Sequence, residues 1–145
     1  MTTLTVGQIW SCDAYCPDES GQPKTKYLLI IGFNGDELVY KTLTSRSHGR
    51  PTNPFCFHGL PYPSYYMGVP HPNGILSKES WLDLRETDDF PVLEFEQKIS
   101  NGIIKYIFTL NQSDMCALLD CAARADDTTR RQSNAILDAR MQAGC

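Results

Sequence analysis

The fold is decided by residues 26–43, which read KYLLIIGFNGDELVYKTL. The run up to Phe33 is nearly continuous in apolar residues, Asn34-Gly35 is a dipeptide typical of type I′ turns, and β character resumes at Glu37. This order predicts a β-hairpin. Its first arm is apolar on both faces, so we expect it to cross the core of the domain rather than lie at an edge.

Further strands are predicted on both sides of this hairpin. Segments with β character lie at residues 6–12, 80–84, 92–96 and 103–108, and those at 80–84 and 92–96 alternate between apolar and polar residues. Asn101-Gly102 offers a second hairpin turn into the last of these segments. Two hairpins and three further strands are enough to form a small antiparallel barrel over residues 6–108.

The spacing of apolar residues becomes helical after the last predicted strand. Asn111 can cap a helix over residues 111–124, and a second helical stretch is expected over residues 128–142. The expected fold class is therefore mainly β with C-terminal helices (α+β). One domain should span residues 1–145, with a C-terminal helical part over 111–142.

Acidic residues are absent from residues 38–77, although the whole chain has a formal net charge of -4. This acid-free segment contains all three histidines and six of the nine prolines, and it contributes +3 while the rest of the chain contributes -7. It is also dotted with aromatic residues. Cations and aromatic rings without carboxylates suit a polyanion, above all single-stranded nucleic acid. The alternative is a proline-rich surface connection with no function of its own.

The composition predicts no membrane segment and no cofactor. The N-terminal residues lack the basic region and apolar run of a signal peptide, and no stretch approaches the length of a membrane span, so we expect a cytoplasmic protein. In that compartment the six cysteines are expected as thiols first, metal ligands second and disulfides last. Cys116 and Cys121 lie in a helical pattern and are expected as small core residues.

One set of residues has the ligand types that tetrahedral zinc takes, namely Cys12, Cys16, Cys56 and His58. The chain has no paired C-x-x-C motif, so the spacing favours thiols. A zinc site is left open as the weaker alternative.

Several short motifs follow one another in a recognisable order. They are Gly7-Gln8-Ile9-Trp10, Lys26 ahead of the apolar strand, Thr42-Leu43-Thr44-Ser45 at the end of the hairpin, and Gly74-Ile75-Leu76 before Trp81-Leu82. With the closing helix, residues 6–123 resemble the MazF/PemK-type toxin endoribonucleases. The related ToxN-like toxins share the barrel and also carry a lysine before the second strand, where MazF relatives carry an Arg-Pro pair. The resemblance implies a small SH3-like, MazF-type antiparallel barrel.

The same resemblance implies an enzyme of a toxin–antitoxin or phage-defence system that cleaves single-stranded RNA without a metal. In this family the RNA 2′-hydroxyl attacks the adjacent phosphate, leaving a cyclic phosphate and a free 5′-hydroxyl. The implied partners are single-stranded RNA and a cognate antitoxin, either protein or RNA, and MazF-type toxins are commonly homodimers. By resemblance, Lys26 occupies the basic position, and Thr44 with Ser45 the phosphate-contacting position.

Residues near this motif also suit the reaction on chemical grounds. Arg46 and Arg50 would present forked, permanently charged donors to phosphate. His48 is the only group beside the motif with a reference pKa near neutrality, so it is the candidate acid or base, with Lys26 as the alternative. RNA bases could stack on Tyr62, Tyr65 and Tyr66.

These residues also have structural alternatives. Lys26 could be the exposed end of a strand, Thr44 and Ser45 could form only turn hydrogen bonds, and His48 could be an ordinary loop residue. A second class of function is a non-catalytic binding module on the same barrel, either a CcdB-like inhibitor of a host protein or a nucleic-acid-binding accessory protein. The acid-free segment would then be the contact surface.

Overall fold

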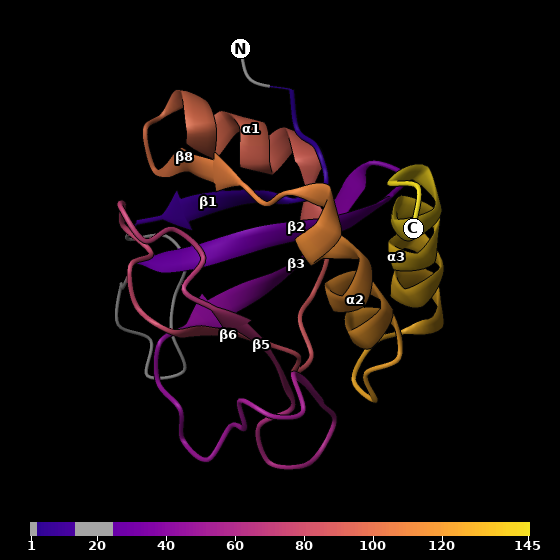
Figure 1. Ribbon diagram of the computed structural model, residues 1–145. Coiled ribbons are helices and arrows are strands. Elements are labelled where there is room, and N and C mark those ends of the chain that lie inside the picture. The colour runs from indigo at the N-terminus through magenta and orange to yellow at the C-terminus, as the bar shows by residue number, and fades with distance from the viewer. Residues whose placement is uncertain (1–2, 14–24) are drawn as a thin grey trace.

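The computed structural model describes residues 3–13 and 25–145, which form an antiparallel sheet with helices on both faces (Figure 1). The sheet has eight strands in the order β4-β5-β6-β3-β2-β1-β8, and β7 pairs with β3. The strands are β1 (Gln8–Cys12), β2 (Lys26–Asn34), β3 (Glu37–Thr44), β4 (Cys56–Phe57), β5 (Ser64–Gly68), β6 (Ser80–Asp83), β7 (Phe90–Pro91) and β8 (Ile104–Thr109). The helices are α1 (Val92–Ser100), α2 (Gln112–Ala123) and α3 (Arg130–Gln142). The predicted α+β class, mainly antiparallel β, is confirmed.

The predicted hairpin is confirmed as β2 and β3, but its turn differs by one residue. Asn34 pairs with Glu37, so the turn residues are Gly35 and Asp36. Of these two, only Gly35 has a positive φ, +61°. This is the pattern of a type II′ turn, in place of the expected type I′. The middle of β2 is buried, as expected for a strand that crosses the core.

The strand predicted at residues 92–96 is wrong, because these residues begin helix α1. Val92, Phe95 and Ile99 lie at helical spacing and pack in one hydrophobic cluster. Apolar and acidic residues alternate from Leu93 to Glu96 at the start of this helix. The same alternation is typical of a half-exposed strand, so the local pattern fits both structures. Residues 101–102 consequently end α1 and lead into β8, rather than turning between two strands.

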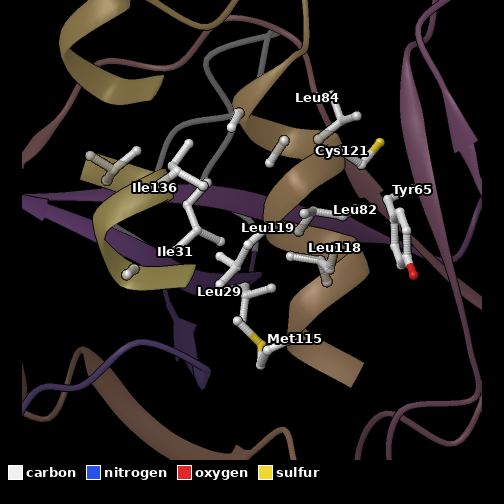
Figure 2. Packing of buried hydrophobic residues seen from close by; sticks show 14 of the residues in the cluster. Leu29, Ile31, Tyr65, Leu82, Leu84, Met115, Leu118, Leu119, Cys121 and Ile136 are labelled. Atoms are coloured by element: carbon white, nitrogen blue, oxygen red, sulfur yellow. The ribbon is translucent and has the colours of Figure 1, made fainter. Parts of the chain in front are cut away.

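Two hydrophobic clusters cover opposite faces of the sheet. Strand β2 contributes Leu29 and Ile31 to one cluster and Leu28 and Ile30 to the other, as the alternation of side chains along a strand requires. The first, the α2/α3-side cluster, lies between the sheet and the two C-terminal helices (Figure 2). The second, the α1-side cluster, includes the fully buried Phe95 of α1.

Both predicted C-terminal helices are confirmed close to their expected bounds. Asn111 caps α2 by accepting a hydrogen bond from the backbone N–H of Asp114. Thr129 and Gln132 form a capping box at the start of α3. Among the described residues, no helix combines the length and the apolar character that a bilayer crossing needs.

The predicted closure of the strands into a barrel is not found in the described part of the chain. Strands β4 and β8 stand at the two ends of the hydrogen-bonded order. Residues that were expected to supply a barrel strand form α1 instead, and α1 packs beside β8 and β7. The sheet is therefore open, with helices completing the cover on both faces.

Two disulfides between described residues join distant parts of the chain, Cys56–Cys121 and Cys116–Cys145, and both end on α2. The expectation that the cysteines are thiols is wrong for these four and for Cys12, which is also disulfide-bonded. Cys121 is nevertheless buried in the α2/α3-side cluster, as expected for a small core residue.

The zinc set proposed from sequence is not brought together. Cys12 lies in the α1-side cluster, whereas Cys56 packs against the α2/α3-side cluster on the other face of the sheet. Cys16 lies outside the described residues. His58 contacts Cys56 and Cys121 instead.

Gly32 marks the place where α3 comes closest to β2. A Cβ at this position would lie 3.1 Å from the backbone carbon and oxygen of Ala135 and 3.2 Å from the backbone nitrogen of Ile136. Backbone atoms cannot rotate away, so Gly32→Ala should push α3 off the sheet. We expect the free energy of unfolding in urea to fall by about 1 to 3 kcal/mol. An unchanged unfolding midpoint would contradict this close approach.

Candidate functional site

A groove of about 670 Å³ opens on the α1 side of the sheet. Leu28 of β2 and Thr42 of β3 are paired at its floor, and α1 forms one wall. Three cations and four carboxylates line it: Lys26, Arg85, Lys98, Asp83, Glu86, Glu94 and Asp127. The groove is thus rich in charged side chains, with one carboxylate more than it has cations, although apolar side chains also line it.

Arg85 is held in the groove by Asp83, which lies at the end of β6. Its Nε donates to both carboxylate oxygens at 3.1 Å, and its Nη2 donates to Oδ2 at 2.7 Å. The backbone N–H of Arg85 also donates to Oδ1. Burial raises the pKa of Asp83, but these hydrogen bonds and the charges of Arg85 and Arg50 outweigh it, so the pKa lies below its usual value. Asp83 therefore stays ionised and fixes the guanidinium.

The ring of Tyr62 contacts two guanidinium groups. Arg50 lies 4.6 Å and Arg85 5.3 Å from the ring centroid, within the range of cation–π contacts. Arg50 is only 6% exposed, and its Nη1 donates to the carbonyl of Arg46. Burial lowers the pKa of Arg50, and the charge of Asp83 opposes that shift. Tyr62 thereby holds both arginines beside the groove.

The chain after β6 is anchored to β3 by a buried lysine. Lys41 is fully buried, and its Nζ donates to the carbonyl of Arg85 at 2.8 Å. Burial lowers the pKa of Lys41, although surrounding carboxylates, Asp83 first among them, oppose the shift. Thr87 donates to the carbonyl of Tyr40. These bonds fix the main chain that carries Arg85.

Several residues predicted from sequence are brought together here. Lys26 lines the groove with Arg85. Arg50 and Tyr62 lie next to Arg85, and the exposed His48 has its ring centroid 5.8 Å from that of Tyr62. His48 is also the one non-glycine residue of the described chain with a positive φ, +43°.

Thr44, Ser45 and Arg46 do not line this groove. The hydroxyl of Thr44 accepts a hydrogen bond from the backbone N–H of Arg46 at 3.2 Å. This is the kind of turn hydrogen bond that the sequence offered as the alternative to a phosphate-contacting role for Thr44. Ser45 and Arg46 are exposed at the end of β3. A phosphate-contacting role for these three residues stays a prediction.

Tyr65 and Tyr66 line a second groove, of about 200 Å³, which shares no lining residue with the first. Tyr65 is 9% exposed and belongs to the α2/α3-side cluster (Figure 2). The hydroxyl of Tyr66 donates to Glu79 at 2.7 Å. Base stacking on these two rings stays a prediction. Neither ring lines the first groove, beside which Tyr62 lies.

Arg85 and Asp83 were missed by sequence reasoning. They follow the acid-free segment by only a few residues. The strand pattern at residues 80–84 gave no reason to expect a functional role for either of them. The fold also supplies the groove with carboxylates from outside the acid-free segment, on β6, α1 and the chain before α3. Lack of acids along the sequence therefore does not produce a groove that lacks acids.

Asp83→Asn should destabilise the protein in a pH-dependent way. The folded pKa of Asp83 is lowered, so the ionised group stabilises the fold at neutral pH, and this contribution is lost as the pH falls below about 4. At pH 7 we expect a loss of about 1 to 2 kcal/mol in the free energy of unfolding, since the partly exposed Arg85 is screened by solvent. The difference from wild type should shrink in urea titrations at low pH.

The matched control for this prediction is Asp120→Asn. Asp120 pairs with Arg124 on the exposed side of α2, where an ion pair contributes little. A stability difference for Asp83→Asn that is no larger than the one for Asp120→Asn, or that grows toward low pH, would contradict the assigned role of Asp83.

Metal-ligating side chains form one group in the described part of the chain, Cys56, His58 and Cys121, and none of them lines the groove. No protein-family model, curated protein or solved structure matches this chain. The role of the groove is therefore argued from its own geometry.

Proposed function

We propose that the groove is the active site of a toxin-type endoribonuclease that cleaves single-stranded RNA without a metal. The observation that carries the proposal is the placement of Lys26 and Arg85 in one groove, with Arg85 fixed by Asp83 through Nε to Oδ1 and Nη2 to Oδ2. Cations that are held in place before the substrate arrives stabilise the charge that develops on a phosphate in the transition state. The motif order that resembles the MazF/PemK-type toxins supports the same assignment.

The proposed reaction moves two protons. The 2′-oxygen attacks the adjacent phosphorus and gives up its proton, the bond from phosphorus to the 5′-oxygen breaks, and the leaving 5′-oxygen takes up a proton. Lys26 and Arg85 would hold the non-bridging oxygens. His48, whose ring lies beside that of Tyr62, would accept the proton of the 2′-hydroxyl, and solvent water would give a proton to the leaving 5′-oxygen. Tyr62 and Arg50 would act as positioning residues for Arg85.

In this proposal the open sheet is a variant of the SH3-like, MazF-type barrel. The consecutive pairing of β1, β2 and β3 and the closing helix α2 support that relation, with α1 in the place of one expected strand.

A toxin of this class needs a partner that inhibits it, and the acid-free segment offers a surface for one. Four large apolar side chains of this segment are exposed, namely Phe55, Leu60, Val69 and Ile75. We propose that this surface contacts a protein antitoxin or the second subunit of a homodimer.

The test is a cleavage assay in EDTA on a long unstructured RNA, with the new ends mapped. We expect discrete cuts that carry 5′-hydroxyl and cyclic phosphate ends. A matched RNA with a 2′-deoxy sugar at the mapped site should resist cleavage there, because it lacks the attacking hydroxyl. Intact RNA from folded protein, or cutting of the deoxy substrate at the same position, would exclude the proposed reaction.

The second candidate function is a non-catalytic binding module. It is favoured by the four carboxylates of the groove, which repel phosphate, and by the exposed apolar side chains of the acid-free segment. If expression of the protein arrests cell growth, Lys26→Ala should relieve the arrest caused by a ribonuclease and leave the arrest caused by a binding module unchanged. A double substitution at Phe55 and Leu60 should relieve the arrest caused by a binding module and leave the arrest caused by a ribonuclease unchanged.

A further inference from the structure

Two cysteines and a histidine meet where β4 approaches the end of α2. The Nε2 atom of His58 lies 3.4 Å from Sγ of Cys56 and 3.5 Å from Sγ of Cys121. Cys56 and Cys121 are 65 residues apart in sequence and are joined as a disulfide. The imidazole nitrogen thus stands nearly equidistant from both sulfur atoms.

These three side chains are the ligand types that structural and catalytic zinc sites use. Their ligand atoms all lie within 4.8 Å of one another. Two thiolates bound to tetrahedral zinc stand about 3.8 Å apart, given zinc–sulfur distances of about 2.3 Å. Side chains whose Cα atoms are 5.7 Å apart can span that separation. Three protein ligands would leave the fourth position open.

The surroundings also suit a cation that comes from solvent. Cys56 and His58 are half-buried, so the cluster is reached from outside, while Cys121 is buried on α2. Nε2 of His58 lies 3.0 Å from the carbonyl oxygen of Cys121, in the last turn of α2. The C-terminal end of a helix carries partial negative charge, which favours a cation.

We propose that Cys56, His58 and Cys121 bind Zn²⁺ when the disulfide between the two cysteines is reduced. A dithiol supplies two electrons and two protons to the disulfide and is itself oxidised to a disulfide. The zinc ion then displaces the two thiol protons, and the proton on Nε2 of His58 moves to Nδ1, so that both sulfurs and Nε2 bind the metal. The disulfide and the metal exclude each other.

The site joins the same two parts of the chain in either state. In oxidising surroundings the disulfide ties β4 to α2, and in reducing surroundings the metal does so. The other disulfide on α2, Cys116–Cys145, does not belong to a group of metal-ligating side chains in the described part of the chain. Its cysteines therefore serve as the control for the metal site. The proposal is independent of the assignment of the groove as a ribonuclease site.

The test is a titration of the reduced, chelator-treated full chain with Co²⁺, followed by Zn²⁺. Sulfur-bound Co²⁺ absorbs by charge transfer in the near ultraviolet, and tetrahedral Co²⁺ absorbs strongly in the visible. We expect one Co²⁺ per chain, displaced by Zn²⁺. Because two thiol protons leave, the apparent affinity should fall by roughly 100-fold per pH unit below the thiol pKa.

Variants locate the metal. Cys56→Ser and Cys121→Ser should each abolish the sulfur–cobalt band, and Cys116→Ser with Cys145→Ser should leave it unchanged. His58→Gln should weaken binding at least tenfold, since even an outer partner of a ligand typically contributes about 10- to 100-fold. Circular dichroism checks that each variant is folded.

Three results would overturn the proposal. The first is no sulfur–cobalt band in wild-type protein whose thiols are shown to be free by thiol titration. The second is a band that persists in Cys56→Ser, which would place the metal at other cysteines. The third is unchanged affinity in His58→Gln.

Discussion

Lys26→Ala is expected to slow RNA cleavage by about 10²- to 10³-fold, the usual loss when one preorganised group that stabilises transition-state charge is removed. Lys26 lines the groove with Arg85, so its ammonium would face the phosphate while the remaining cations hold the RNA in place. The loss should therefore appear mainly in the rate at saturating RNA rather than in binding. Single-turnover cleavage of a short RNA that contains one mapped site measures both.

Lys105→Ala is the matched control for this prediction. Lys105 is an exposed lysine on β8 whose Nζ lies 3.6 Å from a carboxylate oxygen of Asp13, and it does not line the groove. Its replacement changes the net charge of the protein by the same amount and should leave the cleavage rate nearly unchanged. Equal losses in both variants would mean that Lys26 acts only through the overall charge.

Phe95→Ala is expected to lower the free energy of unfolding by about 3 to 5 kcal/mol, the range found when a buried phenylalanine is truncated. Phe95 is fully buried, and its ring packs edge-on against those of Trp10 and Phe90. It is the buried residue of α1, so its loss removes the main contact that holds this helix on the sheet. Urea denaturation followed by tryptophan fluorescence reports the change.

The control lies on the same helix. Leu93 is 75% exposed, and Leu93→Ala should change the stability by no more than about 0.5 kcal/mol. A comparable loss in the two variants would show that α1 is held by its helical propensity rather than by the contacts of Phe95.

The sequence predicts those elements whose signals lie within a few residues of one another. The hairpin of β2 and β3, the cap at Asn111 and the helices that follow are local patterns, and the structure confirms them. Helix α1 imitates a strand in sequence because Leu93 to Glu96 alternate between apolar and acidic residues. Its helical spacing becomes visible only when Ile99 is included, and its partners, such as Trp10, come from far away in sequence.

The candidate site depends on contacts that no local pattern contains. Lys26 could be selected by the family resemblance, Arg50 as a cation near the motif, and Tyr62 as an aromatic residue of the acid-free segment. Arg85 could not, since its position depends on Asp83, on the cation–π contact with Tyr62 and on the buried Lys41 that binds its carbonyl. The two disulfides were likewise missed, because their cysteines show no spacing that reveals which of them lie together in the fold.

The two disulfides that end on α2 also determine how the oxidised protein would carry a mechanical load. Cys116 and Cys121 are less than two helical turns apart. Tension applied between Cys56 and Cys145 would pass through one disulfide to Cys121, along this short piece of α2 to Cys116, and through the other disulfide to the point of pulling. Strands β5, β6 and β8 and helix α3 lie outside that shortest covalent path. Pulling on these two points would therefore stretch part of one helix and leave the sheet under little tension.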